Sequence, residues 1–196
     1  MNQRGPTLSG VQRSGPPVRT DAVDVYVFRE FGGDDTTPPE RAEFLQIRRV
    51  KEPAAGTWQT VMGGIDEGEK AVDAALRELK EEIGAGEGDL TGLRFLGQVY
   101  PFYQPAWDCV VLMPRFAARV RADFEPVLND EHEAHRWNAI ELPADRDAVD
   151  ALAMKYVWSS QRSCVREVVG DVLGRSGSEG VMRVTPPSLS KPETGT

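Results

Sequence analysis

The segment that most constrains this chain is residues 63–85, GGIDEGEKAVDAALRELKEEIGA. Within it, apolar residues recur at steps of three and four, which predicts a helix over residues 69–83 with one buried face. Gly84 and Gly86 follow these residues and favour the end of the helix there. Such a helix needs a second apolar surface to pack on, which we expect to be a sheet. The apolar residues are Val72, Leu76, Leu79 and Ile83.

Three glutamates flank the apolar face, and we expect them to lie at a solvated rim of the packed helix. Glu78, Glu81 and Glu82 fall within about 100° of one another around a helix, so they share one side of it. Like charges at these spacings are mildly destabilising unless cations bridge them, and carboxylate oxygens are the ligands that Mg²⁺ and Mn²⁺ prefer. The alternative is a solvated charged face paired with Arg77 and Lys80, which three helical glutamates by themselves would favour. The spacing of the neighbouring residues decides between the two.

That spacing matches a known pattern. Gly63 is followed by five residues, Glu69, seven residues and then RELKEEIGA at residues 77–85. The arrangement resembles the Nudix box, and every fixed position of the box is present. From average residue usage, such a match at a given start has a chance on the order of one in a billion. Ala85 is smaller than the aliphatic residue usual there, so we expect a small packing loss and no change in chemistry.

The resemblance implies a fold, a chemistry and a cofactor. The fold is of the α/β (α+β) class, a Nudix-type α/β/α sandwich with a mixed sheet and the box helix packed on it. The chemistry is attack by water on a diphosphate bond, with Mg²⁺ as the cofactor and Mn²⁺ as the alternative. The expected partner is a nucleotide-like small molecule. A homodimer is left open, because many members of the family dimerise.

The resemblance also implies roles for individual residues. Arg77 and Glu69 are expected to form a buried pair that orients the metal ligands, because loosely held ligands lose affinity. Gly63 permits the tight turn before the helix. Glu81 and Glu82 are expected to be catalytic as well as metal-binding. The expected metal ligands are Glu78, Glu81, Glu82 and the carbonyl of Met62.

A fourth acidic residue is expected in the run EHEAHRW, residues 131–137. This run resembles one in the family branch that cleaves dATP and dihydroneopterin triphosphate, and it makes Glu131 the candidate catalytic base. Glu133 is the competing assignment, and a plain loop carboxylate is the alternative role. His132 and His135 do not favour zinc, because they are three residues apart in a loop-to-strand segment, whereas the zincin motif needs helical histidines four apart.

Two further segments, GTWQTVMGG and MKYVWSSQRSCVREVV, resemble the same branch. They imply a nucleoside or pterin triphosphate substrate that is cleaved to a monophosphate and pyrophosphate, and they make Trp58 a candidate substrate contact. Dinucleoside polyphosphates and ADP-ribose-type compounds remain alternatives, because the box fixes the chemistry and not the leaving groups. A non-catalytic Nudix-fold binding domain is the second alternative, although such domains typically lose box glutamates.

Candidate residues for the rest of the substrate lie in YPFYQPAW, residues 100–107. Its two prolines and its aromatic side chains predict an exposed hairpin tip, at which Tyr103 and Trp107 stack on a base or pterin. Packing in the core is the alternative. Arg48 and Arg49 end a predicted strand near the box, and strand alternation points them to opposite faces. We expect Arg49 to bind phosphate, with a solvated strand end as the alternative.

Composition narrows the class of protein. The net charge of −8 argues against a general nucleic-acid binder, which needs a basic surface. No apolar run reaches the roughly 20 residues of a membrane span, and the N-terminal residues lack a secretory signal pattern, so we expect a cytoplasmic protein without membrane association. Cys109 and Cys164 belong to no CxxC motif. Two reduced, buried thiols are favoured over a disulfide.

The chain is long enough for one domain, which we place at residues 21–173. Residues 1–20 and 174–196 are rich in Gly, Pro, Ser and Thr, and are predicted to be disordered tails. The predicted strands span residues 22–28, 44–49, 58–62, 93–100, 109–120 and 135–140, and the predicted later helices span 144–152 and 154–169.

Overall fold

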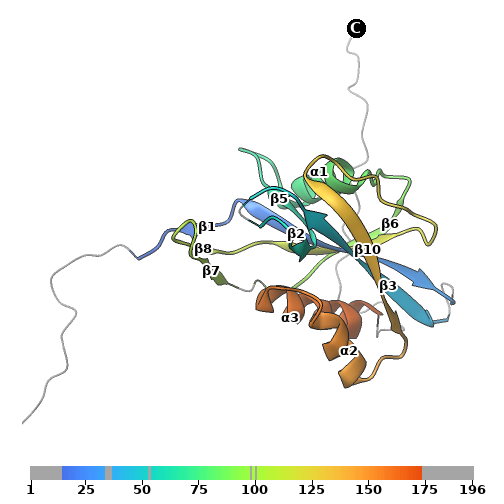
Figure 1. Cartoon of the computed structure of the whole chain (residues 1–196). Helices are drawn as coiled ribbons and strands as arrows, with labels where there is room; N and C mark the ends of the chain where they lie inside the picture. Colours follow the sequence, from blue (N-terminus) through green and yellow to red (C-terminus); the bar gives the residue numbers. More distant parts are fainter. Residues whose placement is uncertain (1–14, 34–36, 53, 98, 100, 174–196) are drawn as a thin grey trace, which may run out of the picture.

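The computed structural model describes residues 15–33, 37–52, 54–97, 99 and 101–173 (Figure 1). Among the residues described, no helix has the length and apolar character needed to cross a membrane. The helices are α1 (Ala71–Ile83), α2 (Arg146–Ala153) and α3 (Ser159–Glu167), followed by the π-helical segment η1 (Val168–Leu173). The strands are β1 (Val18–Arg19), β2 (Ala22–Phe31), β3 (Arg41–Arg49), β4 (Trp58–Gln59), β5 (Val61–Gly64), β6 (Leu90–Phe95), β7 (Phe102–Gln104), β8 (Cys109–Val111), β9 (Arg115–Val120) and β10 (His132–Glu141).

The strands form a larger and a smaller sheet. The larger sheet has the order β10-β3-β2-β9-β6, with β4 paired to β3 and β5 paired to β2. Strands β2 and β9 run parallel, whereas the other pairs of this sheet are antiparallel, so the sheet is mixed. The smaller sheet has the order β1-β8-β7.

Helices cover both faces of the larger sheet. In Figure 1, α1 lies above the sheet and α2 and α3 lie below it, which confirms the expected α/β/α sandwich. Strand β2 explains how one sheet serves two cores: Val23, Val25 and Val27 pack into the cluster that contains α1, while Tyr26 and Phe28 pack against α2 and α3. Successive side chains of a strand point to opposite faces, so the alternation in β2 supplies both layers. The two cysteines are buried free thiols, as predicted.

Helix α1 forms where the apolar spacing predicts it, with Leu79 and Ile83 fully buried. It begins two residues later than predicted, because Glu69 belongs to the preceding loop and its carboxylate accepts the Asp66 N–H at 2.9 Å. It ends at Gly84, whose φ of 71° is the left-handed conformation common after a helix. The predicted end of the helix is therefore confirmed.

The folded part begins before residue 21. The prediction of a disordered tail is wrong for residues 18–19, because β1 pairs in parallel with β8. The pairing uses backbone groups, with the Val110 N–H bonded to the Pro17 carbonyl and the Leu112 N–H bonded to the Arg19 carbonyl. A two-residue strand with exposed side chains has no apolar pattern that a sequence could show. Residues 1–14 and 174–196 lie outside the described residues.

Several other predicted elements differ from the structure, and the predicted strand over residues 58–62 is two strands, β4 and β5, which pair with β3 and β2. The single strand over residues 109–120 is wrong: β8 and β9 belong to different sheets, and Pro114 between them has no N–H for a ladder bond. The strand over residues 93–100 ends at Phe95, and residues 98 and 100 lie outside the described ones. The last helix starts at Ser159 rather than at residue 154, after a turn.

Candidate active site

Arg77 on α1 is the centre of a network of glutamates. Its Nε and Nη2 donate to the two oxygens of Glu69, each at 3.0 Å, which is the paired geometry of a strong guanidinium–carboxylate contact. Its Nη1 donates to Glu78 at 2.6 Å and to Glu81 at 3.2 Å, and its Nη2 also donates to the Gly64 carbonyl at 2.8 Å. The hydrogen bonds from Arg77 hold the pKa of Glu69 below its ordinary value. One guanidinium thus joins the loop before α1 to the carboxylates on the helix.

Gly63 allows the Glu78 carboxylate to lie against strand β5. A Cβ atom at position 63 would come within 1.8 Å of the Glu78 Cδ, so no residue with a side chain fits while Glu78 keeps this position. The neighbouring Gly64 is different, because a Cβ there would meet its nearest atom, the Asp21 carbonyl oxygen, at 3.9 Å. Position 63 therefore requires glycine because the backbone there lies so close to the Glu78 carboxylate.

Glu82 is buried on the same side of α1. Its Oε2 accepts the Met62 N–H at 3.2 Å, and its Oε1 lies 3.9 Å from the Nε2 of His132. Burial, with the nearby charge of Glu78, raises the pKa of Glu82 to about 8. Burial also raises the pKa of Glu78. The expectation that Glu78 and Glu82 sit at a solvated rim is wrong, since only Glu81 is largely exposed, at 56% of its side chain.

The carboxylates of the three box glutamates do not converge on one point in this structure. In the described part of the chain, no three His, Cys, Asp or Glu side chains gather closely enough to hold a metal ion as they stand. The hydrogen bonds to Arg77 explain this, because they turn Glu78 and Glu81 toward the guanidinium. The donor set still fits a hard divalent cation: Glu78 and Glu82 are desolvated carboxylates whose raised pKa a nearby cation would lower. Exposed Glu81 can turn to join them.

Glu131 precedes β10 and is held by two cations. The Arg49 Nη1 lies 3.1 Å from its Oε2, and the Lys51 Nζ lies 3.2 Å from its Oε1. Burial opposes ionisation, but the hydrogen bonds and charges of Lys51 and Arg49 outweigh it and lower the pKa of Glu131. The next residue, His132, lies 3.9 Å from Glu82, which places Glu131 near the box. Glu133, the competing assignment, pairs with Arg48 on the other face of the strands, at 3.0 Å.

His132 is a buried neighbour of Glu82 that the sequence pattern did not assign to the site. Its Nδ1 lies 2.9 Å from the Asn129 Oδ1, and its Nε2 lies 3.4 Å from the Gln59 Nε2. Burial, together with the charge of Arg49, lowers the pKa of His132 to about 4, so the ring is neutral at neutral pH. A neutral ring that donates from Nδ1 and accepts at Nε2 satisfies both contacts.

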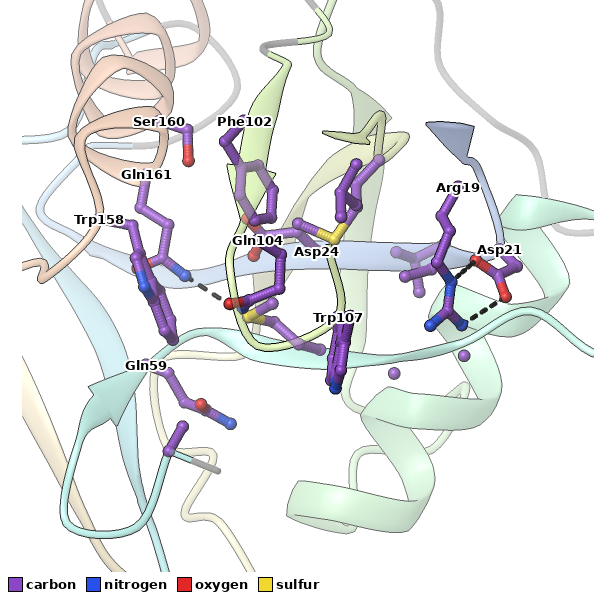
Figure 2. A pocket seen from close by; sticks show the side chains of 18 of the residues that line it. Arg19, Asp21, Asp24, Gln59, Phe102, Gln104, Trp107, Trp158, Ser160 and Gln161 are labelled. Atoms are coloured by element: carbon purple, nitrogen blue, oxygen red, sulfur yellow. Dashed lines mark hydrogen bonds and ion pairs between the residues drawn. The ribbon is translucent and has the colours of Figure 1, made fainter. Parts of the chain in front are cut away.

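A cavity of about 350 Å³ lies beside the box loop (Figure 2). This volume is within the range of small-molecule sites, which is about 300–1,000 Å³. Strands β5 and β2, the β7–β8 hairpin and the start of α3 contribute its walls. Gly63 belongs both to this lining and to the contact with Glu78, so the cavity and the box glutamates share a wall.

The structure brings some of the predicted substrate residues to the cavity and leaves others outside. Arg49, Gly63 and Trp107 line it. Trp58 does not line it, and the Arg136 guanidinium lies over the Trp58 ring, 4.3 Å from its centroid. Tyr103 does not line it either: it is exposed, and its hydroxyl donates to Asp108 at 2.7 Å. Arg48 and Arg49 point to opposite faces, as strand alternation predicts.

The sequence pattern did not reveal several residues that line the cavity. Trp158 directly precedes α3, Gln161 lies in the first turn of α3, and Gln104 comes from the end of β7. Arg19 comes from β1, in the segment predicted to be a tail, and its guanidinium lies 5.3 Å from the centroid of the Trp107 ring. Trp158 and Gln161 belong to the WSSQR run. The family resemblance of this run is the sequence feature that could have indicated their place in the site.

The NUDIX domain family model matches residues 18–155. The chain belongs to the Nudix family. It is 39% identical to an RNA pyrophosphohydrolase of Sulfurovum sp. over 75 residues, which cover 33% of this chain and 46% of the relative. It is 32% identical to the ADP compounds hydrolase NudE of Escherichia coli over 117 residues, which cover 56% of this chain and 63% of the relative. The matches thus span less than two thirds of the length of either relative.

Solved structures share the Nudix fold of this chain. An Ap4A hydrolase of C. elegans, solved as a binary complex, aligns with a TM-score of 0.59 at 18% identity and covers 80% of this chain and 100% of its own. The dihydroneopterin triphosphate pyrophosphohydrolase of E. coli aligns with a TM-score of 0.55 at 22% identity and covers 75% of this chain and 94% of its own. At these identities the similarity concerns the fold.

Proposed function

We propose that this protein is a Nudix pyrophosphohydrolase that cleaves a phosphoric anhydride bond in a nucleotide-like substrate. The observation that carries the proposal is the position of Gly63: it lines the cavity and also lies against the Glu78 carboxylate, so the cavity adjoins the box glutamates. The names of the relatives, an RNA pyrophosphohydrolase and an ADP compounds hydrolase, describe the same class of bond cleavage and support the proposal.

In the reaction, the water oxygen forms a bond to phosphorus, the bond from phosphorus to the bridging oxygen breaks, and the water gives up a proton. Nudix enzymes use divalent metal ions; when bound here, Mg²⁺ would neutralise charge on the phosphate oxygens. Glu78, Glu81 and Glu82 would hold it. Arg77 holds Glu78 and Glu81 on its side of α1 through the contacts described above, whereas the Met62 N–H holds Glu82.

Arg49 and Glu131 complete the proposed phosphate end of the site. Arg49 lines the cavity and contacts Glu131, so its guanidinium can meet a phosphate that enters from the cavity. When Arg49 turns to the phosphate, Glu131 loses one of its two cationic partners and becomes available to accept the proton of the water. Glu131 is therefore the proposed base, and Mn²⁺ is the alternative metal.

For the substrate, we propose a nucleoside or pterin triphosphate that yields a monophosphate and pyrophosphate. Support comes from the GTWQTVMGG and WSSQR segments, which resemble the dATP and dihydroneopterin triphosphate branch. The relative named an ADP compounds hydrolase favours ADP-ribose-type compounds as the second candidate. In either case the non-phosphate group would occupy the cavity.

The test is hydrolysis of a substrate panel with Mg²⁺: dNTPs, dihydroneopterin triphosphate, diadenosine polyphosphates and ADP-ribose, with the products separated by chromatography. We expect one triphosphate to yield a monophosphate and pyrophosphate. Removal of the metal with EDTA should abolish turnover, and Glu82→Gln should lower it by about 100-fold or more. Glu133→Gln is the matched control and should retain activity, because Glu133 lies on the other face. No cleavage of any compound with Mg²⁺ or Mn²⁺ would favour a non-catalytic binding domain.

A further inference from the structure

Gln161 lies at the end of a buried chain of polar groups beneath the cavity. Asp24 is fully buried in β2, where it accepts hydrogen bonds from the Tyr26 hydroxyl and from the Thr60 hydroxyl and pairs with Arg115 at 3.3 Å. The Gln161 Nε2 donates to the Thr60 Oγ1 at 2.9 Å. Since Thr60 gives its only proton to Asp24, its oxygen can only accept from Gln161. The chain of bonds therefore fixes which end of the Gln161 amide faces Thr60.

This orientation leaves an acceptor without a partner. The Gln161 Oε1 is buried and has no hydrogen-bond donor, although the residue lines the cavity and is only 1% exposed. A buried acceptor without a donor costs free energy that a ligand donor would recover. In Figure 2, Gln161 of α3 and Trp158, the residue before α3, extend toward the cavity, with Trp107 on its far side and Gln104 between the two tryptophans.

The rest of the lining restricts the chemistry of the group that enters. Among the described residues of the lining, each charged side chain already has an ion-pair partner: Arg19 with Asp21, Arg49 with Glu131, and Asp24 with Arg115. The other walls are largely apolar and aromatic, with Trp158, Trp107 and Phe102 among them. Such walls suit an uncharged planar ring, which can stack on the indole faces.

We propose that this cavity binds a planar nitrogen heterocycle with an exocyclic amino group, and that Gln161 selects it by accepting a hydrogen bond from that amino group. An exocyclic amino group projects beyond the ring edge, so it can meet an acceptor in the cavity wall more readily than a ring N–H can. The inference rests on the proposed function and narrows its substrate to compounds with amino-bearing bases or an aminopterin-type ring. Bases without an exocyclic amino group are discriminated against.

The experiment compares nucleosides that differ only in the amino group, with no phosphate and no metal present. The pairs are adenosine with purine riboside and guanosine with inosine, and binding is followed by NMR titration of the tryptophan indole N–H signals. The wild-type protein should bind the amino member of at least one pair about 10-fold more tightly or better, because only that member satisfies the buried acceptor. Gln161→Met should reduce the preference to within about 2-fold, as expected when the buried acceptor is removed.

Gln104→Met is the matched control. Gln104 lines the same cavity, but its Oε1 already accepts the Ala106 N–H at 3.4 Å, so the preference should survive this change. Equal binding of both members of both pairs by the wild-type protein overturns the inference, whether or not the variants fold. A preference that persists in Gln161→Met also overturns it. Because the nucleosides carry no anhydride bond, this binding experiment does not depend on turnover. A preference for the amino member, together with no cleavage of any compound in the substrate panel, would overturn the proposed activity and leave the inference standing.

Discussion

At the scale of single residues, Arg77 donates hydrogen bonds to three glutamates and to a backbone carbonyl, so this one side chain helps to position all four groups. Arg77→Ala removes all of these donors and leaves Glu69 and Glu78 without their cation. We expect the free energy of unfolding to fall by about 2 kcal/mol, which is less than for a fully buried pair because Arg77 keeps some exposure. For a domain of this size that corresponds to a fall in Tm of about 4–8 °C. Thermal unfolding measures it.

Turnover of Arg77→Ala should fall by at least about 10-fold, because carboxylates that are no longer oriented bind a metal more weakly. Lys80→Ala is the control on the same helix, since Lys80 is exposed. It should leave both Tm and turnover nearly unchanged. If Arg77→Ala behaved like this control, the network around Arg77 would have no role in either stability or catalysis.

At the scale of helices and strands, the junction of β5 and α1 requires a glycine at position 63. Gly63→Ala places a Cβ within 1.8 Å of the Glu78 Cδ, so the carboxylate must move. We expect metal-dependent turnover to fall by about 10–100-fold, the usual cost of disturbing the support of a metal ligand. Tm should change little, because the group that moves is the end of a flexible side chain.

The adjacent Gly64 supplies the control for this prediction. An alanine there meets only the Asp21 carbonyl oxygen, at the ordinary contact distance of 3.9 Å. Turnover of Gly63→Ala and Gly64→Ala, measured across a Mg²⁺ titration, tests whether only the first variant loses activity. Similar activity in Gly63→Ala and Gly64→Ala would show that the position of Glu78 beside β5 does not matter for metal binding.

The same junction shows what the sequence could predict. The order and spacing from Gly63 to Gly84 are local, so a pattern along the chain predicts both the helix and its glutamates. Burial of Glu82 depends on contacts with Met62 and His132, which lie 20 and 50 residues away in the chain, so the pattern wrongly suggested a solvated rim. The spacing of residues along one helix gives their relative directions but not what packs on top of them.

At the scale of the whole molecule, the cavity forms where the two sheets and α3 meet. Its walls include Arg19 from the smaller sheet, Gln59 from the larger one and Gln161 from α3. These residues are far apart in the chain and share no spacing, so only the tertiary fold brings them together. The prediction of a tail was wrong at residues 18–19 for the same reason, because β1 is held by backbone bonds to β8.

The pairing of β1 with β8 therefore makes a prediction about truncation. Removal of residues 1–20 deletes the backbone bonds to β8 and takes the Arg19 guanidinium away from the face of Trp107. Arg19 and Trp107 both line the cavity, and their contact, worth about 0.5–1 kcal/mol at an exposed site, helps to hold the Trp107 ring in place. We therefore expect KM to rise by about 2–5-fold at most, while kcat stays within about 2-fold because the box is untouched. Removal of residues 1–14 keeps β1 and should leave KM unchanged. Steady-state kinetics on both truncated proteins test whether β1 supports substrate binding. An equal KM in the two would mean that β1 contributes nothing to substrate binding. A loss of kcat confined to the longer deletion would mean that β1 supports the box as well as the cavity.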